Sequence, residues 1–242
     1  MKRFLLVLAA LLGVPAAALG LAVWNTVRPT SGTRIEAARR GKALILVDLQ
    51  EDYTGPHAQQ SYQEPERLIA AANQLIESAR AGGWPIYVTR VAMPNDWFHR
   101  LLTGGAAIAG TRGADFDARL VRADTTEVVK TKSDSFANPL LDTQLAANQV
   151  GELFIAGIDA GFCVKKTIRG ALNRGYRVNV VREGIATRHS TPLEEHIADY
   201  EAAGAVMTSL GGAKTELSHR AEPPTRSAVI EGAPSRRDPE SR

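Results

Sequence analysis

A chain of 242 residues, of which 44% are apolar and 23% charged, is long enough to bury a substantial core in one large domain or two small ones. Its net charge of +3 is too small to predict nucleic-acid binding. The only cysteine, Cys163, excludes an intramolecular disulfide framework and any zinc site of the cysteine type.

The first segment, residues 4–24, contains no charged residue and follows Lys2-Arg3. Roughly 20 apolar residues are enough to cross a bilayer, and Trp24 suits the interface between membrane and water. A cleaved secretory signal is the competing interpretation, because small residues near Gly20 are compatible with cleavage. The uninterrupted length favours a single-pass N-terminal membrane anchor. Basic residues on both flanks leave the membrane side open, and those that follow the segment favour a cytoplasmic domain.

Residues 25–41 are polar and basic, without sustained periodicity, and are predicted to be a linker. Apolar runs typical of buried strands then alternate with helical periodicity. The predicted strands are 43–48, 85–90, 126–130, 153–156, 177–182 and 205–210, and the predicted helices are 65–81, 139–148, 163–173 and 191–203. This alternation predicts a mainly parallel sheet of about six strands with helices on both faces. Residues 42–210 form the predicted domain, and the polar residues 211–242 are predicted to be a disordered tail.

Cys163 stands between a predicted strand and a predicted helix. The stretch from Gly157 to Gly161 is too small and turn-prone to continue the strand, so the cysteine begins the helix. At a helix N-terminus, unpaired N–H groups and the helix dipole favour a thiolate, which is the nucleophilic form of cysteine. A lone cysteine is also a common small apolar core residue, so its position alone does not decide between the two interpretations.

Two further reactive side chains end predicted strands, Asp48 at the first strand and Lys130 at the third. Because the carboxyl ends of parallel strands meet at one edge of the sheet, we expect Asp48, Lys130 and Cys163 to converge there. The Lys130 ammonium would lower the pKa of the Cys163 thiol, and Asp48 would take the thiol proton and return it to a leaving group. The turn before Cys163 would offer backbone N–H groups to a developing oxyanion.

Three blocks of the sequence resemble the isochorismatase-like cysteine hydrolases. The block from Val47 to Tyr53 looks like their opening Val-Asp-x-Gln-x-Asp-Phe. The block from Lys130 to Phe136 resembles their Lys-x-x-x-Ser-Ala-Phe, in which the first lysine is the catalytic one. The stretch beginning at Gly157 is similar to their Gly-Val-x-Thr-x-x-Cys-Val signature. The resemblance spans about residues 42–210, with the blocks in the right order and spacing.

The resemblance implies a three-layer α/β/α sandwich. It also implies hydrolysis of a small amide, ureido or carbamoyl C–N bond through a thioester, with a catalytic triad of Asp48, Lys130 and Cys163. A non-proline cis peptide bond is implied between Ile158 and Asp159. The N–H groups of Asp159 and Cys163 would then form the oxyanion hole, aimed at the carbonyl oxygen of the substrate.

Gln50, Tyr53 and Phe136 are predicted to line the substrate pocket. Core packing is the alternative for Tyr53 and Phe136, and Gln50 could instead orient its own loop. Two departures from the family pattern fall near this pocket: Ala160 replaces the usual threonine, and Asp134 interrupts the Ser-Ala-Phe block. These departures concern the identity of the substrate more than the triad.

The metal-binding nicotinamidases of the same family carry an Asp-x-His motif, whereas Asp96 and His99 are separated by one residue too many. We therefore predict no metal site and no cofactor. A nicotinamidase with an atypical metal site stays open as an alternative, as does a catalytically idle, membrane-tethered module that binds a small molecule. The expected partner is a small-molecule substrate and not nucleic acid, and a homo-oligomer is left open.

Overall fold

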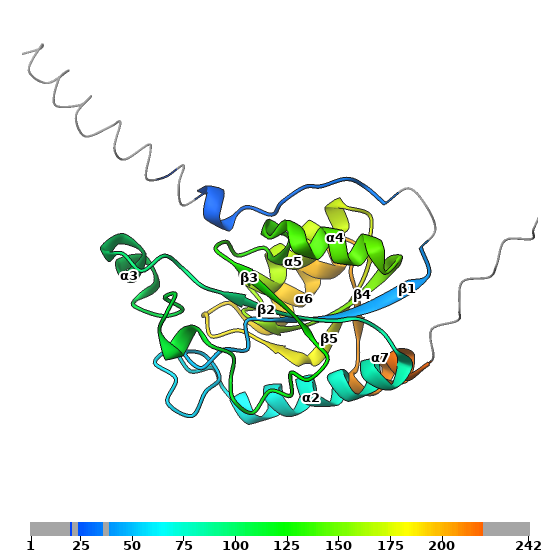
Figure 1. Ribbon diagram of the computed structural model, residues 1–242, viewed down its shortest axis with the longest axis horizontal. Coiled ribbons are helices and arrows are strands. Elements are labelled where there is room, and N and C mark those ends of the chain that lie inside the picture. Colours follow the sequence, from blue (N-terminus) through cyan, green and yellow to red (C-terminus); the bar gives the residue numbers. More distant parts are fainter. Residues whose placement is uncertain (1–19, 21–23, 36–38, 220–242) are drawn as a thin grey trace, which may run out of the picture.

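Six parallel strands form one sheet in the order β3-β2-β1-β4-β5-β6 (Figure 1). The structure, a computed structural model, describes residues 20, 24–35 and 39–219. The strands are β1 (Gly41–Val47), β2 (Ile86–Val91), β3 (Thr126–Lys130), β4 (Val150–Ile158), β5 (Arg177–Ala186) and β6 (Val206–Thr208). The helices are α2 (Pro65–Gly82), α3 (Trp97–Thr103), α4 (Pro139–Ala147), α5 (Cys163–Asn173), α6 (Leu193–Ala202) and α7 (Leu210–Ser218), with short 3-10 helices η1 (Arg112–Ala114) and η2 (Ser135–Ala137).

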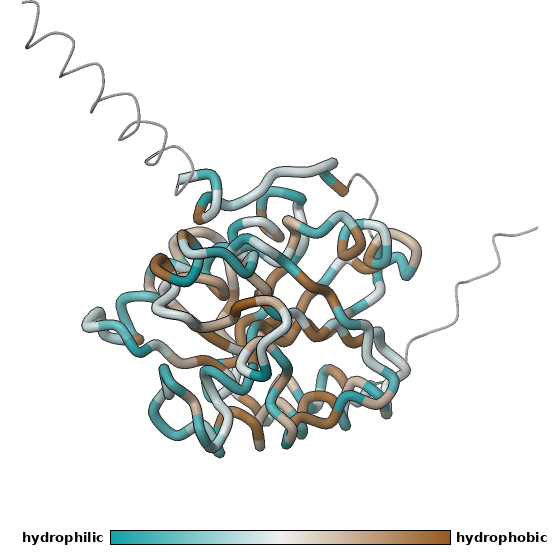
Figure 2. The backbone as a smooth tube through the Cα atoms, turned by 60° about the vertical axis from the view of Figure 1, so that its left-hand side comes forward, coloured by the Kyte–Doolittle hydropathy of each residue, from teal (hydrophilic) through white to brown (hydrophobic). Residues whose placement is uncertain are grey.

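Helices cover both faces of the sheet. In Figure 1, α4, α5 and α6 lie on one face, and α2 and α7 lie on the other. Side chains of β1 alternate between the two cores, with Ala43, Ile45 and Val47 in one and Leu44 and Leu46 in the other. Figure 2 shows the apolar residues gathered along the central strands between the two helical layers. The predicted three-layer α/β/α sandwich with a six-stranded, mainly parallel sheet is confirmed.

The strand order reverses between β1 and β4, which lie side by side in the middle of the sheet. The chain continues outward from β1 to β2 and from β4 to β5. Gly157 makes the contact between β1 and β4 close, because a Cβ at this residue would lie 2.1 Å from the carbonyl oxygen of Val47, and its φ of +123° also favours glycine. Residues that follow β1 and β4 therefore share the crevice at the carboxyl edge, where open α/β sheets bind their ligands.

β5 extends beyond Arg182, where the sequence predicted its end. The register between β4 and β5 shifts after Ile155, so that Gly157 pairs with Ile185. Such a shift is a bulge, after which the strand resumes and runs to Ala186. The residues that β5 delivers to the crevice are consequently those that follow Ala186.

The domain also extends beyond its predicted end at Leu210. The apolar residues Ala213 and Leu217 of α7 are fully buried against the core that includes α2. Gly82 permits this packing, since a Cβ there would lie 2.1 Å from the carbonyl oxygen of Leu217. The prediction of a tail from residue 211 is thus wrong for α7, and residues 220–242 of that tail lie outside the described residues.

The predicted membrane location is also corrected. Among the residues that the structure describes, no helix is both long enough and apolar enough to cross a bilayer. Most of the predicted anchor, residues 4–19 and 21–23, lies outside the described part of the chain. The predicted linker is partly described, and its residues 25–35 are hydrogen-bonded to the domain instead of standing free.

Candidate active site

Asp48 and Lys130 form a buried ion pair at the carboxyl edge of the sheet. Asp48 follows β1 in a left-handed backbone conformation, with a φ of 56°, and Lys130 is the last residue of β3. The Nζ atom of Lys130 donates to Oδ2 of Asp48 at 2.7 Å, and the two side chains are 0% and 2% exposed. Because β2 lies between β1 and β3, the long lysine side chain bridges the edge of a strand to reach the carboxylate.

Cys163 begins α5 and lines the same cavity as Asp48. Its thiol lies close enough to the Asp48 carboxylate and the Lys130 ammonium for both groups to shift its pKa. The second carboxylate oxygen, Oδ1 of Asp48, is buried and has no well-aligned hydrogen-bond partner among the described residues. The structure thus brings the three predicted catalytic side chains together and leaves one oxygen of Asp48 available to accept a proton.

The protonation state of Cys163 differs from the prediction. Burial raises the pKa of the thiol to about 12; the Lys130 ammonium lowers it and the Asp48 charge raises it further. Burial would lower the pKa of Lys130, but the charges of Asp48 and Cys163 raise it overall. Lys130 thus lowers the pKa of the thiol, as expected, but desolvation and the Asp48 charge outweigh it and the net change is upward. The raised pKa favours the thiol over the thiolate, so that a proton is transferred when the sulfur reacts.

The turn between β4 and α5 contains two backbone N–H groups without a protein acceptor among the described residues, those of Asp159 and Cys163. The peptide bond between Ile158 and Asp159 is cis, as the family resemblance implied. The Asp159 carboxylate holds the turn in place by accepting from the N–H groups of Gly161 at 2.7 Å and Arg188 at 3.1 Å. The use of the two N–H groups as an oxyanion hole stays a prediction.

A cavity of about 250 Å³ opens beside Cys163. Tyr53, one of the predicted pocket residues, lines it together with Tyr62, and the two rings stand edge to face with centroids 6.2 Å apart. Burial raises the pKa of both hydroxyl groups, so they stay neutral. The whole lining consists of Asp48, Tyr53, Tyr62, Ser133, Ile158, Asp159, Phe162, Cys163, Arg188 and His189. The cavity is of a size for a small molecule.

Six residues of the cavity lining were not predicted as site residues, and two of them, Arg188 and His189, carry basic side chains. The guanidinium carbon of Arg188 lies 5.9 Å from the centroid of the Tyr62 ring, and no carboxylate among the described residues pairs with this exposed cation. The ring of His189 packs on Phe162 with centroids 4.7 Å apart, and its Nε2 lies 3.8 Å from an oxygen of Asp159. Both follow the carboxyl end of β5, so the rule that found the triad would have found them had the bulge been recognised.

Gln50 and Phe136 do not line the cavity, which corrects their prediction. Gln50 is fully buried, where its Nε2 donates to the carbonyl oxygens of Val91 and Ala114 and its Oε1 accepts from the N–H of Val91, each at 2.9 Å. Phe136 lies in the core with the guanidinium of Arg174 at 4.5 Å from its ring centroid. Both side chains are buried inside the protein and do not face the cavity.

The residues that the structure describes do not fit a metal site. Among the described residues, no group of three or more His, Cys, Asp or Glu side chains could hold a metal ion. His99 lies with Nδ1 at 2.7 Å from Oδ2 of Asp96, whose other oxygen caps the start of α3. Neither residue lines the cavity beside Cys163. The metal-dependent alternative therefore lacks a ligand set in the described part of the chain.

Comparisons with known proteins agree with this fold. The isochorismatase domain family matches residues 42–211. The N-carbamoylsarcosine amidase of an Arthrobacter species is 29% identical over 171 residues, which cover 66% of this chain and 64% of that protein. The maleamate amidohydrolase of Pseudomonas putida is 26% identical over 201 residues, which cover 78% of this chain and 92% of that protein.

The crystal structure of the N-carbamoylsarcosine amidase from Thermoplasma acidophilum superimposes with a TM-score of 0.63 at 24% identity, covering 70% of this chain and 96% of that one. This likeness concerns the fold, whereas the family match concerns the sequence and covers most of the chain. The matched residues include all three side chains that meet at the carboxyl edge of the sheet. This chain therefore belongs to the isochorismatase family of hydrolases.

Proposed function

We propose that this chain is a cysteine amidohydrolase that cleaves the C–N bond of a small amide, ureido or carbamoyl compound through a thioester on Cys163. The observation that carries the proposal is the contact of Cys163 with the buried Asp48–Lys130 pair at a cavity. A module that only binds a ligand has no need of a buried ion pair beside a thiol, since burying two charges is costly. The names of the amidase relatives support the same class of reaction.

The reaction begins when the Cys163 sulfur attacks the carbonyl carbon of the substrate. Because the thiol is protonated at neutral pH, its proton passes to the open oxygen, Oδ1 of Asp48, as the S–C bond forms. Lys130 holds the other carboxylate oxygen and balances the charge of Asp48. The carbonyl oxygen becomes an oxyanion, which the N–H groups of Asp159 and Cys163 stabilise.

The intermediate then collapses and breaks the C–N bond. The proton held by Asp48 goes to the leaving nitrogen, which departs as ammonia or an amine and leaves the acyl group as a thioester on Cys163. Asp48 next takes a proton from water, whose oxygen attacks the thioester carbon. The C–S bond breaks, the proton returns to the sulfur, and the product leaves as a carboxylic or carbamic acid.

The charge of the cavity supports an anionic substrate. Arg188 is the cation in its lining that has no carboxylate partner among the described residues. Its charge opposes the rise in pKa that burial causes at Tyr53 and Tyr62, so its field reaches both walls of the cavity. The substrates in the names of two relatives, N-carbamoylsarcosine and maleamate, each combine a carboxylate with a carbonyl–nitrogen bond. We propose that Arg188 pairs with a carboxylate of the substrate.

Release of ammonia from a panel of compounds tests this function. The panel contains N-carbamoyl amino acids, half-amides of dicarboxylic acids, and neutral amides of the same size. Cys163→Ala should abolish turnover, and Cys163→Ser should reduce it strongly because an alcohol is a weaker nucleophile than a thiol. Full turnover by Cys163→Ala on any compound that the native chain hydrolyses would overturn the proposal.

A further inference from the structure

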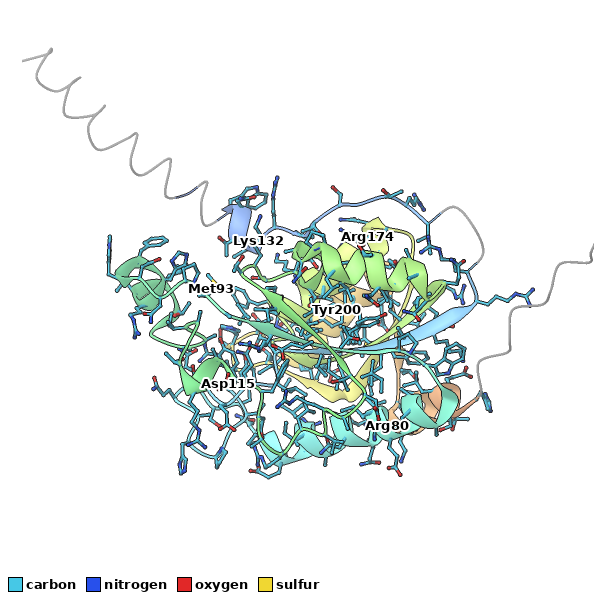
Figure 3. The ribbon with its side chains drawn as sticks, in the orientation of Figure 1. Arg80, Met93, Asp115, Lys132, Arg174 and Tyr200 are labelled. Carbon is cyan, nitrogen blue, oxygen red and sulfur yellow. The ribbon has the colours of Figure 1, made fainter. Side chains whose placement is uncertain are left out.

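The described N-terminal residues 24–35, here called the N-terminal strap, lie outside the isochorismatase domain, whose match begins at residue 42. The strap runs in blue along the face formed by α4 and α5 in Figure 1. The N–H of Ser133, in the loop after β3, donates to the carbonyl oxygen of Thr26 at 3.1 Å. Figure 3 shows Lys132 of the same loop close to the helical turn with which the strap begins.

A second cavity, of about 260 Å³, lies on the strap side of Cys163. Its walls come from the strap, from the end of β2 and the residues after it, and from α3 and its following loop. The lining is largely apolar, and the residues that matter here are Val27, Val91, Met93, Leu102, Ala107 and Cys163. Met93 is labelled in Figure 3, on the side of the molecule where α3 lies. Without the strap, this cavity would lose one of its walls.

The two cavities meet at the thiol. Tyr53, Ser133, Phe162 and Cys163 line both of them. One cavity contains the charged Arg188, whereas the other is lined mostly by apolar side chains, with Lys132 as its charged residue. A carbonyl carbon placed at the sulfur carries two substituents, and the two cavities provide a polar space for one and an apolar space for the other.

Thr30 anchors the strap to a buried carboxylate. Oδ2 of Asp134, a fully buried residue, accepts hydrogen bonds from the N–H and from the Oγ1 of Thr30, both at 2.7 Å. Arg174 donates to Oγ1 of Thr30 at 3.0 Å and is itself paired with Asp142 at 2.7 Å. Asn173 donates to the carbonyl oxygen of Thr30 at 2.9 Å. Buried charged groups need such partners, so the contact between strap and domain is specific.

Asp134 is the residue that interrupts the Ser-Ala-Phe block of the family pattern. Its carboxylate fits because residue 170 of α5 is glycine, where a Cβ would lie 2.4 Å from Oδ2 of Asp134. Gly32 of the strap makes similar room, since a Cβ there would lie 2.7 Å from Nε of Arg174. The departure at Asp134 is therefore explained by the strap that it holds.

We propose that the N-terminal strap is a specificity element of the active site, in which Val27 limits the size of the apolar group that a substrate carries beside the scissile C–N bond. The strap does this as a fixed wall, held at Thr26 and at Thr30 by two adjacent residues of the loop after β3, Ser133 and Asp134. The identity of the reaction rests on the proposed function, whereas the position of the wall can be tested without any substrate.

Alkylation of Cys163 in the full chain tests the wall. N-methylmaleimide and N-phenylmaleimide react with the same thiolate, so the ratio of their rates at one pH is independent of the thiol pKa. Val27→Trp should lower the phenyl-to-methyl ratio by at least about fivefold, because an overfilled site rejects the larger ring. Val27→Ala should raise the ratio. Val206→Trp, the same change at an exposed position of β6, should leave it unchanged.

A phenyl-to-methyl ratio that stays the same in both Val27 variants would overturn the proposal. Thr30→Val tests the anchor in parallel, because loss of the hydroxyl should speed tryptic cleavage after Arg34, an exposed residue of the strap. Thr215→Val, the same change at an exposed position of α7, should not do so, and equal cleavage of the two variants would show that Thr30 does not hold the strap. If the Val27 variants change the maleimide ratio but the native chain hydrolyses no compound of the panel, the position of the wall is supported and the proposed function is rejected.

Discussion

The ammonium of Lys130 lies 2.7 Å from the carboxylate of Asp48, although 82 residues separate them and another strand lies between theirs. Both side chains are almost completely buried. A single charge at this depth would be poorly solvated, so each of the two groups depends on the other. The pair is thus both a structural unit and the proposed acid–base partner of Cys163.

Removing one member of the pair should destabilise the protein. We expect Lys130→Met to lower the free energy of unfolding by about 3–5 kcal/mol, because Asp48 would be left as an unpaired buried carboxylate. The double variant Lys130→Met/Asp48→Asn should recover most of that stability without recovering activity. Urea unfolding monitored by circular dichroism measures both effects. Additive losses in the double variant would contradict the description of the two residues as one unit.

Removing the charge of Asp48 should abolish the proposed proton transfer while the backbone stays in place. Asp48 and Asp124 both adopt a φ of 56°, which asparagine tolerates, so the change to asparagine is matched at the two positions. We expect Asp48→Asn to lower kcat by about 10²–10⁴-fold and Asp124→Asn, at an exposed position, to leave it unchanged. Equal activity of the two variants in the ammonia assay would exclude Asp48 as the base.

The rate at which Cys163 is alkylated should keep rising with pH far above neutrality. Because the pKa of the thiol is raised to about 12, only about 1 in 10⁴ molecules carries a thiolate at pH 8. The rate with iodoacetamide should therefore rise by roughly tenfold per pH unit from pH 7 to 10, without a plateau.

Two variants should move this profile in opposite directions. Asp48→Asn removes a negative charge that raises the thiol pKa, so alkylation should be faster at a given pH. Lys130→Met removes the cation that lowers the pKa, so alkylation should be slower. The loss of iodoacetamide-reactive thiol over time measures each rate. A plateau near pH 8 in the native chain would show that the free enzyme holds a low-pKa thiolate.

Arg188 should discriminate between charged and neutral substrates. We expect Arg188→Gln to raise KM by about tenfold or more for an amide that carries a carboxylate, because a charge-assisted hydrogen bond is lost. The KM of a neutral amide of similar size should change little. Arg177→Gln, at an exposed residue where β5 begins, is the matched control. An equal rise in KM for both substrates would assign Arg188 a structural role.

Gln50 should matter for stability and not for substrate binding. Gln50→Leu removes the Gln50 partner of the N–H and of the carbonyl oxygen of Val91, while the carbonyl oxygen of Ala114 keeps Arg90 as a donor, so we expect a loss of about 2–3 kcal/mol in the free energy of unfolding. Gln59→Leu, at an exposed loop position, should cost far less. Denaturant unfolding compares the two variants. A raised KM in Gln50→Leu with unchanged stability would restore Gln50 as a wall of the pocket.

The convergence of Asp48, Lys130 and Cys163 was predictable because one geometric rule governs it. In a parallel sheet, every strand delivers its next residues to the same edge, so the ends of three apolar runs located all three side chains. The same rule did not find Arg188. The charged residue Arg182 ends the apolar run in the sequence, whereas β5 passes through a bulge and continues to Ala186. An error of four residues in one strand end thus hid a cation of the cavity.

Other features depend on contacts that periodicity does not encode. Gln50 is close to Asp48 in the sequence, but its side chain is hydrogen-bonded to backbone groups at the ends of β2 and η1. The net rise in the pKa of Cys163 comes from desolvation and from the charge of Asp48, which depend on the folded surroundings of the thiol. The strap has the composition of a linker, and only the buried Asp134 reveals that Thr30 has a fixed place.

The central claim is a covalent acyl intermediate on Cys163, and mass spectrometry of the protein quenched during turnover tests it most directly. With a substrate chosen from the panel, the intact mass should rise by that of the acyl group, and fragmentation should place the addition on Cys163. Cys163→Ser and Cys163→Ala serve as the comparison. Turnover in which the native chain carries no acyl group at Cys163, under conditions that trap a synthetic thioester at that residue, would contradict this account.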